Sequence, residues 1–146
     1  MESKKELFSL GDIYISDFIK EGEPPRGPKS LLTLVLEEST GAVRLTKVPN
    51  GDVMYGQYWY RSGINATMTR ELGEIVSSCT DAIKINDGDV WLDIACNDGT
   101  LLKQVPNNMT KIGCDPADDS YTHESRHVAD LVIQDYFNEK AYKESK

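Results

Sequence analysis

The stretch "VWLDIACNDGTLL", residues 90–102, indicates a buried strand, a sharp turn and the start of a helix. Its first part, "VWLDIA" (90–95), is nearly continuously apolar, as expected of a parallel strand that is covered on both faces. Two polar residues, Asn97 and Asp98, directly precede Gly99, although a turn needs only the glycine. Ligands of open parallel sheets bind beyond the carboxyl ends of the strands, so we interpret this corner as a site for a small polar ligand.

The segments around this corner predict an α/β sheet. "TKIGCDP" (110–116) and "ADLVIQDYF" (129–137) indicate a second and a third strand, and residues 138–146 indicate the opening of a helix. Between the first two strands, Pro106 should cut short a helix that starts near Gly99. The order of helix, strand, helix, strand, linker, strand and helix is typical of an α/β fold.

A longer helix is expected before the sheet, in "NATMTRELGEIVSSCTDAI" (65–83). Asn65 is a suitable N-cap, and apolar residues after it recur at helical spacing. They are Met68, Leu72, Ile75, Val76 and Cys79. One apolar stripe of this kind predicts an amphipathic helix.

Residues 1–52 are expected to form a small N-terminal lobe, and residues 53–146 the α/β domain. Residues 7–30 look irregular, because "EGEPPRGPKS" carries three prolines and two glycines within ten residues. Two β-rich runs, 31–36 and 42–48, predict a β-hairpin, and the "PNGD" that follows predicts a second turn.

The composition argues against several classes of partner. Sixteen basic residues against 24 acidic ones give a net charge of −8, which disfavours nucleic acids and anionic membrane surfaces. No apolar run reaches the length of about 18 residues that a membrane span needs. The three cysteines form no C-x-x-C pair, which favours reduced thiols and a cytoplasmic location. "HESRH" (123–127) matches the zinc-binding H-E-x-x-H pattern, but its polar flanks favour a solvated linker over a metalloprotease helix.

Acidic residues at the predicted strand ends indicate a positively charged nucleoside. Asp93 and Asp115 are 22 residues apart, close to the spacing of about 20 at which a carboxylate accepts hydrogen bonds from ribose hydroxyls. A dinucleotide motif would have a glycine at Ala95, and Asp98 before Gly99 would repel a pyrophosphate. The same carboxylate would attract the ammonium and sulfonium groups of S-adenosylmethionine, which we therefore favour over NAD. The alternative is that these residues only form turns and end the strands.

Three motifs resemble those of one enzyme family. "YWYRSGIN" (58–65), "DVWLDIACNDGTLL" (89–102) and "IGCDPA" (112–117) are similar to Y-x-Y-x-S-G, V-L-D-I-G-x-N-D-G-T-L-L and G-x-D-P-A. The combination resembles the class I S-adenosylmethionine-dependent methyltransferases of the sugar (NDP-hexose) C-methyltransferase type, over about residues 7–140. The resemblance implies a Rossmann-like sheet and methyl transfer to a small-molecule acceptor. That acceptor would be a carbon beside a keto group on a nucleotide-linked sugar, reached through an enolate.

The resemblance also assigns the site. Tyr58 and Tyr60 would face the acceptor as catalytic residues; the alternative is that both pack in the core. The residues that would bind the cofactor are Ser62, Gly63, Asp93, Ala95, Asn97, Asp98, Gly99, Asp115, Pro116, Asp135 and Tyr136. Among them, Asp115 would contact the ribose, and Asp135 would lie near the adenine amine with Tyr136 or Phe137 beside the ring. Those at the methionine end would be Asp93, Asn97, Asp98 and Gly99.

The chain departs from the family pattern in three places. The family's second zinc-binding cysteine pair would fall at Glu37 and Thr40, so we expect a zinc-free hairpin and no metal. Ala95 replaces a glycine and is expected to crowd the cofactor. The sequence ends near the third strand, so we expect an incomplete Rossmann-like domain, completed by a partner chain or by further sequence that carries the general base, a His or Glu. The alternative functions are a non-catalytic subunit that binds the cofactor or a partner, and an NAD-binding Rossmann domain.

Overall fold

The computed structural model describes residues 3–15 and 19–146. Two compact units divide the chain, Met1–Met54 and Tyr55–Lys146, where the sequence predicts a boundary between residues 52 and 53. The chain is mixed α/β, as expected: one unit holds a three-stranded antiparallel sheet and the other a three-stranded parallel sheet. Among the described helices, none combines the length and the apolar character needed to span a membrane.

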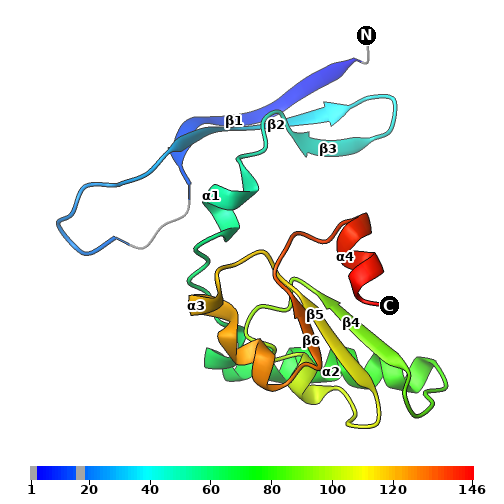
Figure 1. Ribbon diagram of the computed structural model, residues 1–146. Coiled ribbons are helices and arrows are strands. Elements are labelled where there is room, and N and C mark those ends of the chain that lie inside the picture. The colour runs from blue at the N-terminus through cyan, green and yellow to red at the C-terminus, as the bar shows by residue number, and fades with distance from the viewer. Residues whose placement is uncertain (1–2, 16–18) are drawn as a thin grey trace. The chain divides into compact units, whose positions relative to one another are not determined.

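The N-terminal unit is an antiparallel sheet of order β1-β2-β3, formed by β1 (Lys4–Tyr14), β2 (Lys29–Glu37) and β3 (Ala42–Leu45) (Figure 1). The predicted β-hairpin is confirmed, because β2 pairs with β3 from Leu34 opposite Leu45 to Glu37 opposite Ala42. Between β1 and β2, the described part of the Pro- and Gly-rich stretch forms turns and loop, as predicted.

The prediction that residues 7–30 are irregular is wrong for β1, which pairs with β2 along its whole length. Two irregularities in β1, between Glu6 and Phe8 and between Ser9 and Gly11, shift the register of the pairing. Each bulge adds an unpaired residue and reverses the faces that follow, so the apolar residues of β1 do not alternate in sequence. Residues 16–18 of the same prediction lie outside the described residues.

Polar contacts close the turn between β2 and β3, at the positions where the family resemblance places a cysteine pair. The Thr40 Oγ1 hydroxyl donates to Glu37 Oε2 at 3.1 Å, and Arg44 Nε lies 3.0 Å from the same oxygen. In the described part of the chain, no three His, Cys, Asp or Glu side chains are grouped so that they could hold a metal ion.

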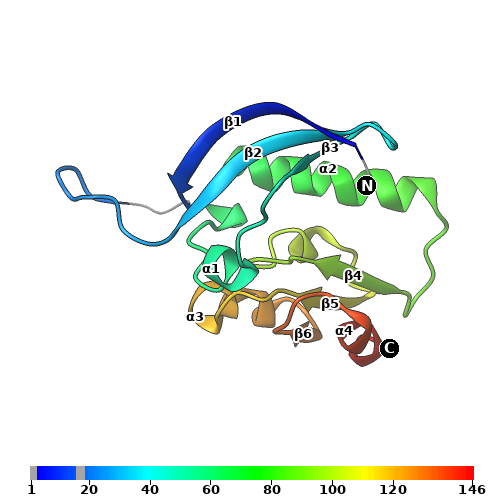
Figure 2. The same cartoon turned by 90° about the horizontal axis from the view of Figure 1, so that it is seen from above.

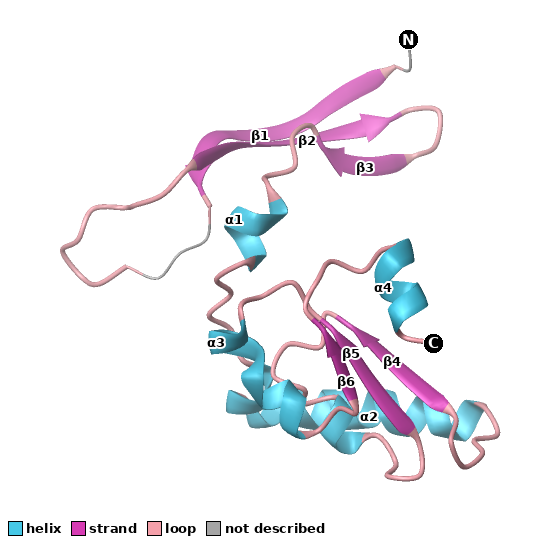
Figure 3. Ribbon diagram, viewed as in Figure 1, coloured by secondary structure: helices cyan, strands magenta, loops and turns pink. Residues whose placement is uncertain are grey.

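The C-terminal unit is built on a parallel sheet of order β4-β5-β6 (Figure 3). Its strands are β4 (Val90–Ile94), β5 (Thr110–Cys114) and β6 (Leu131–Ile133). The longer helices are α1 (Gly51–Tyr55), α2 (Ala66–Ala82), α3 (Asp119–Thr122) and α4 (Glu139–Glu144), and α1 begins where the sequence predicts a turn. Single 3₁₀ turns are η1 (Ser62–Ile64), η2 (Leu102–Gln104) and η3 (His123–His127).

Helix α2 covers one face of this sheet and α4 the other (Figure 2). As predicted, the Asn65 side chain caps α2 by accepting hydrogen bonds from the backbone N–H groups of Thr67 and Met68. The buried part of the predicted stripe is narrower than expected, because Val76 is buried whereas Ile75 and Cys79 are exposed. Val76 packs with residues of the loops after β4, namely Cys96, Leu102, Val105 and Met109.

Strand β5, rather than β4, is the strand covered on both faces. Four of its five residues are buried, whereas Val90 and Ile94 of β4 are 55% and 52% exposed. The cause is the strand order, which places β5 in the middle and leaves β4 paired on one side in the described chain. The apolar run 90–95 therefore predicts the strand correctly but not its burial.

The helix predicted from Gly99 is wrong, because only the 3₁₀ turn η2 forms there. Asn97 and Gly99 both have left-handed φ angles, of 50° and 77°, which no α-helix contains. Val105 is extended with ψ of 136°, the conformation that a following proline imposes, so little chain remains for helical turns.

Downstream of β5, two further predictions need correction. The third strand is confined to β6 and does not extend over residues 129–137. The "HESRH" segment forms η3, in which Ser125 is fully buried, so it is packed rather than a solvated linker. The predicted C-terminal helix is confirmed as α4, and Asn138 caps it by accepting from the Ala141 N–H.

Candidate ligand-binding site

Residues 55–64, which we call the tyrosine strap, are fastened to the loops that follow β4 and β5. The Gly56 carbonyl accepts a hydrogen bond from the Asp118 N–H at 3.1 Å, in the loop after β5. Arg61 donates to Glu124 Oε1 at 2.9 Å and to the Ser120 carbonyl at 3.4 Å. The strap is thereby held near the carboxyl edge of the sheet, and the Glu of "HESRH" is an ion-pair partner for Arg61.

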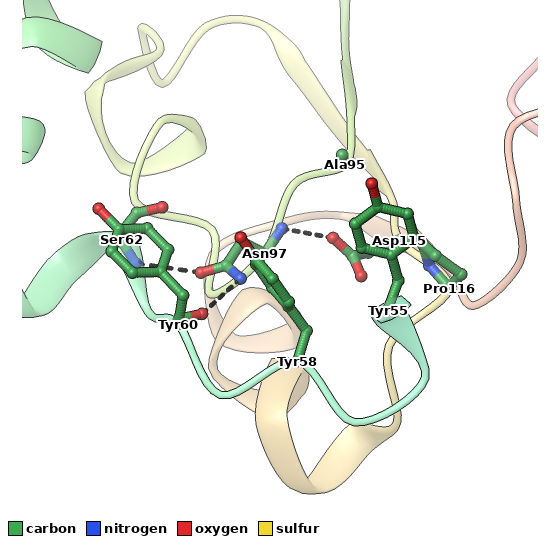
Figure 4. A pocket seen from close by; sticks show the side chains of 8 residues that line it. All are labelled: Tyr55, Tyr58, Tyr60, Ser62, Ala95, Asn97, Asp115 and Pro116. Carbon is green, nitrogen blue, oxygen red and sulfur yellow. Dashed lines mark hydrogen bonds between the residues drawn. The ribbon is translucent and has the colours of Figure 1, made fainter. Parts of the chain in front are cut away.

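Asn97 binds the strap with both ends of its amide (Figure 4). Its Nδ2 donates to the Tyr60 carbonyl at 2.8 Å, and its Oδ1 accepts from the Ser62 N–H at 3.1 Å. Asparagine tolerates the left-handed conformation found here, with φ of 50°, better than most residues. The asparagine at this turn therefore joins two segments that are 35 residues or more apart.

Asp98 is 1% exposed and accepts three hydrogen bonds. One comes from the Gly63 N–H of the strap at 2.8 Å, and two come from the N–H and the hydroxyl of Thr100 at 3.1 and 2.6 Å. The expectation that this carboxylate faces the ligand is wrong, because its oxygens are directed at the strap and at its own loop. Asn97 and Asp98 precede the glycine because they hold the strap.

Two glycines predicted to bind the cofactor have packing roles instead. A Cβ at Gly63 would lie 2.7 Å from Thr100 Oγ1 and 3.0 Å from Asp98 Oδ2. A Cβ at Gly99 would lie 2.7 Å from Val128 Cγ2, and its φ of +77° disfavours side chains as well. Neither glycine lines the pocket described next.

A pocket of about 360 Å³ opens between the strap and the loops after β4 and β5 (Figure 4). Its lining residues are Tyr55, Tyr58, Tyr60, Ser62, Ala95, Asn97, Asp115 and Pro116. All of them except Tyr55 are site residues predicted from the sequence. The three tyrosine rings form one cluster, with centroid distances of 5.8 Å between Tyr55 and Tyr58 and 6.3 Å between Tyr58 and Tyr60. These rings line a pocket wall, and each is at least 40% exposed, so core packing is not their main role.

Asp115 is placed in the pocket by its own loop. Its Oδ2 accepts from the Asn97 N–H at 2.8 Å, and its Oδ1 accepts from the Ala117 N–H at 2.9 Å. A carboxylate has about four acceptor sites, so each oxygen retains capacity for a hydroxyl donor from a ligand. The carboxylate is therefore oriented and still able to bind.

Asp93 lies under the site rather than on its surface. Its Oδ2 is buried and has no hydrogen-bond partner among the described residues. Burial, with a further contribution from the negative charge of Asp115, raises the pKa of Asp93 to about 6. A positive charge placed near this carboxyl group would favour its ionised form.

Asp135 and Tyr136, predicted to lie near adenine, do not line the pocket. Asp135 Oδ1 accepts from the backbone N–H of Tyr136, and the Asp135 carbonyl accepts from the Cys114 thiol. These contacts turn the chain away after β6. Cys96, beside the site, is no nucleophile, because burial and the charges of Asp115 and Asp93 raise the pKa of its thiol to about 12.

Comparisons with known proteins gave no relative: no protein-family model matches the chain, and no curated protein matches it. Membership of the sugar C-methyltransferase family stays a prediction from the three motifs quoted above.

Proposed function

We propose that the C-terminal unit binds S-adenosylmethionine and serves a methyltransferase. The observation that carries this proposal is the pocket at the carboxyl edge of the sheet, where an oriented Asp115 carboxylate faces a cluster of tyrosine rings. Its volume of about 360 Å³ is at the small end of the range, roughly 300–1,000 Å³, that small-molecule sites occupy. A carboxylate beside aromatic rings is suited to a ligand that combines a ribose, a base and a positive charge.

The charges around the pocket favour a cation over a dinucleotide. A pyrophosphate needs free backbone N–H groups at a helix N-terminus. Here the Asn97 N–H is bound by Asp115 and the Thr100 N–H by Asp98, and no α-helix follows β4. Asp93 adds a buried oxygen without a partner in the described chain. The donor set therefore fits S-adenosylmethionine and disfavours NAD.

The residues that would hold the cofactor have distinct tasks. Asp115 would accept hydrogen bonds from the ribose hydroxyls, and the tyrosine rings would face the positively charged group. The cofactor supplies an electrophilic methyl group on a sulfonium. The strap would exclude water and orient the acceptor, which is the part of the reaction that a protein can accelerate most by positioning. The family resemblance assigns the acceptor as a nucleotide-linked keto sugar.

One observation favours a second candidate, a subunit that binds the cofactor without catalysing the reaction. Removal of a proton beside a carbonyl needs a general base. The titratable groups among the lining residues are the three tyrosines and Asp115, whose two oxygens already accept backbone hydrogen bonds. Under the leading candidate, Tyr58 and Tyr60 are the catalytic residues.

Calorimetric titration of the chain with S-adenosylhomocysteine, S-adenosylmethionine and NAD tests the proposal. We expect both sulfur nucleosides to bind and NAD not to bind. Asp115→Ala should weaken binding of S-adenosylhomocysteine about 10- to 100-fold, since a charged hydrogen-bond partner is lost. Asp87→Ala is the matched control, because this exposed aspartate precedes β4 at the opposite end of the strand.

Asp115 also holds two backbone N–H groups, so a second arm must separate ribose binding from loop structure. The 2′-deoxy analogue of S-adenosylhomocysteine, titrated into the wild type, removes the hydroxyl without changing the protein. Weaker binding of the analogue supports the ribose contact, and equal binding of both nucleosides removes Asp115 from it. Methyl transfer to keto sugar nucleotides by the chain distinguishes the enzyme from the non-catalytic subunit.

A further inference from the structure

Tyr55 lines the pocket although it lies outside the Y-x-Y-x-S-G motif, which begins at Tyr58. It is the last residue of α1. Figure 4 shows its ring on the side of the pocket formed by Asp115 and Pro116, whereas Tyr60 is on the side of Ser62. The two ends of the pocket therefore have different aromatic walls.

The backbone beside Tyr55 is tied to the loop that carries Asp115. The Gly56 carbonyl, one residue further along the strap, accepts from the Asp118 N–H at 3.1 Å. The Tyr58 ring then meets the Tyr55 ring edge to face, with a centroid distance of 5.8 Å and an interplanar angle of 66°. The ring is 42% exposed, so it has free surface beside the pocket instead of filling a core.

We propose that Tyr55 and Pro116 are the walls of a slot for the nucleobase of the ligand, and that Tyr55 stacks on the base. This inference rests on the proposed function, in which Asp115 binds the ribose to which the base is attached. An aromatic ring and the flat face of a proline both suit a planar base. The residues that the sequence places near adenine, Asp135 and Tyr136, are absent from the pocket lining, so the base needs another wall.

Calorimetric titrations with adenosine and with S-adenosylhomocysteine test the slot. Stacking on an aromatic ring is strong enough that Tyr55→Ala should weaken binding of both ligands about 10- to 100-fold. Tyr55→Phe should bind both like the wild type, because the ring is kept. Tyr142→Ala, which removes a similarly exposed tyrosine from α4, is the matched control and should change neither affinity.

The outcomes separate the two proposals. If the wild type binds neither ligand, the proposed function fails and the slot with it. If the wild type binds both and Tyr55→Ala binds adenosine equally well, the slot is overturned while the cofactor site stands. An equal loss in Tyr55→Phe would also overturn it, since the hydroxyl and not the ring would then contact the ligand. Urea unfolding of each variant checks that the unit is folded.

Discussion

The carboxyl ends of β4 and β5 lie side by side and each carries an aspartate, but the two carboxylates have opposite surroundings. Asp115 follows β5, accepts one backbone N–H on each oxygen and lines the pocket. Asp93 lies one residue before the end of β4 and has a buried oxygen with no partner in the described chain. Burial alone therefore does not define the role of an acidic residue here.

The difference comes from where the loop after β4 directs its N–H groups. Those of Ala95 and Cys96 donate to the Cys114 carbonyl, and that of Asn97 donates to Asp115. All three point toward β5, the central strand, and none reaches back to Asp93. Since an unpaired buried carboxylate disfavours its charged form, Asp93 has the raised pKa, of about 6.

Asp98, the third carboxylate, gives the largest expected effect. It is buried and holds three donors, so Asp98→Ala leaves three polar groups without a partner and detaches the strap at Gly63. We expect a loss of about 3–4 kcal/mol in the free energy of unfolding, measured by urea titration. Asp119→Ala, which removes an exposed partner of Arg126, should change it by less than about 1 kcal/mol. Similar losses for both variants would show that Asp98 is not the anchor.

Asp93→Asn tests the other side of the comparison and should stabilise the protein. Between the ordinary value of 3.8 and the raised pKa of about 6, the folded state binds a proton that the unfolded state has lost. Ionised Asp93 therefore lowers stability as pH rises through this window, the reverse of a salt-bridged aspartate. Above pH 6 the cost reaches about 2–3 kcal/mol, so the variant should exceed the wild type by up to that amount.

Unfolding midpoints of the wild type and Asp93→Asn, measured from pH 3.5 to 8, give the outcome directly. The difference between them should be near zero at the acid end and should grow to a plateau above pH 6. A constant difference over the whole range would mean that Asp93 titrates normally. A difference that shrinks as pH rises would mean that the carboxylate has a partner.

Local patterns in the sequence predict most of the elements but not their burial. The Asn65 cap and the apolar spacing after it define α2, and the apolar run and "TKIGC" define β4 and β5. Strand β1 is missed because its two bulges hide the alternation of faces. The exposure of β4 depends on strand order, which no local pattern contains.

The candidate site is predicted in its membership and misread in its roles. Seven of its eight lining residues carry motif signals, and Tyr55, which lies outside the motif, does not. The spacing of Asp98 next to Gly99 is the same whether the carboxylate faces a ligand or a protein backbone. Its partner, the Gly63 N–H, is 35 residues away, so the choice depends on the tertiary fold.

Ala95→Gly gives the smallest effect and separates backbone strain from side-chain function in the loop after β4. Ala95 has a φ of 64°, a left-handed conformation that costs a residue with a Cβ about 1 kcal/mol, so glycine should raise the free energy of unfolding by up to that amount. Asn97 has a similar φ, of 50°, but its amide holds the strap through two hydrogen bonds. Asn97→Gly should therefore destabilise the protein although it relieves the same strain. If urea unfolding shows that both glycines stabilise the protein, the strap does not depend on Asn97.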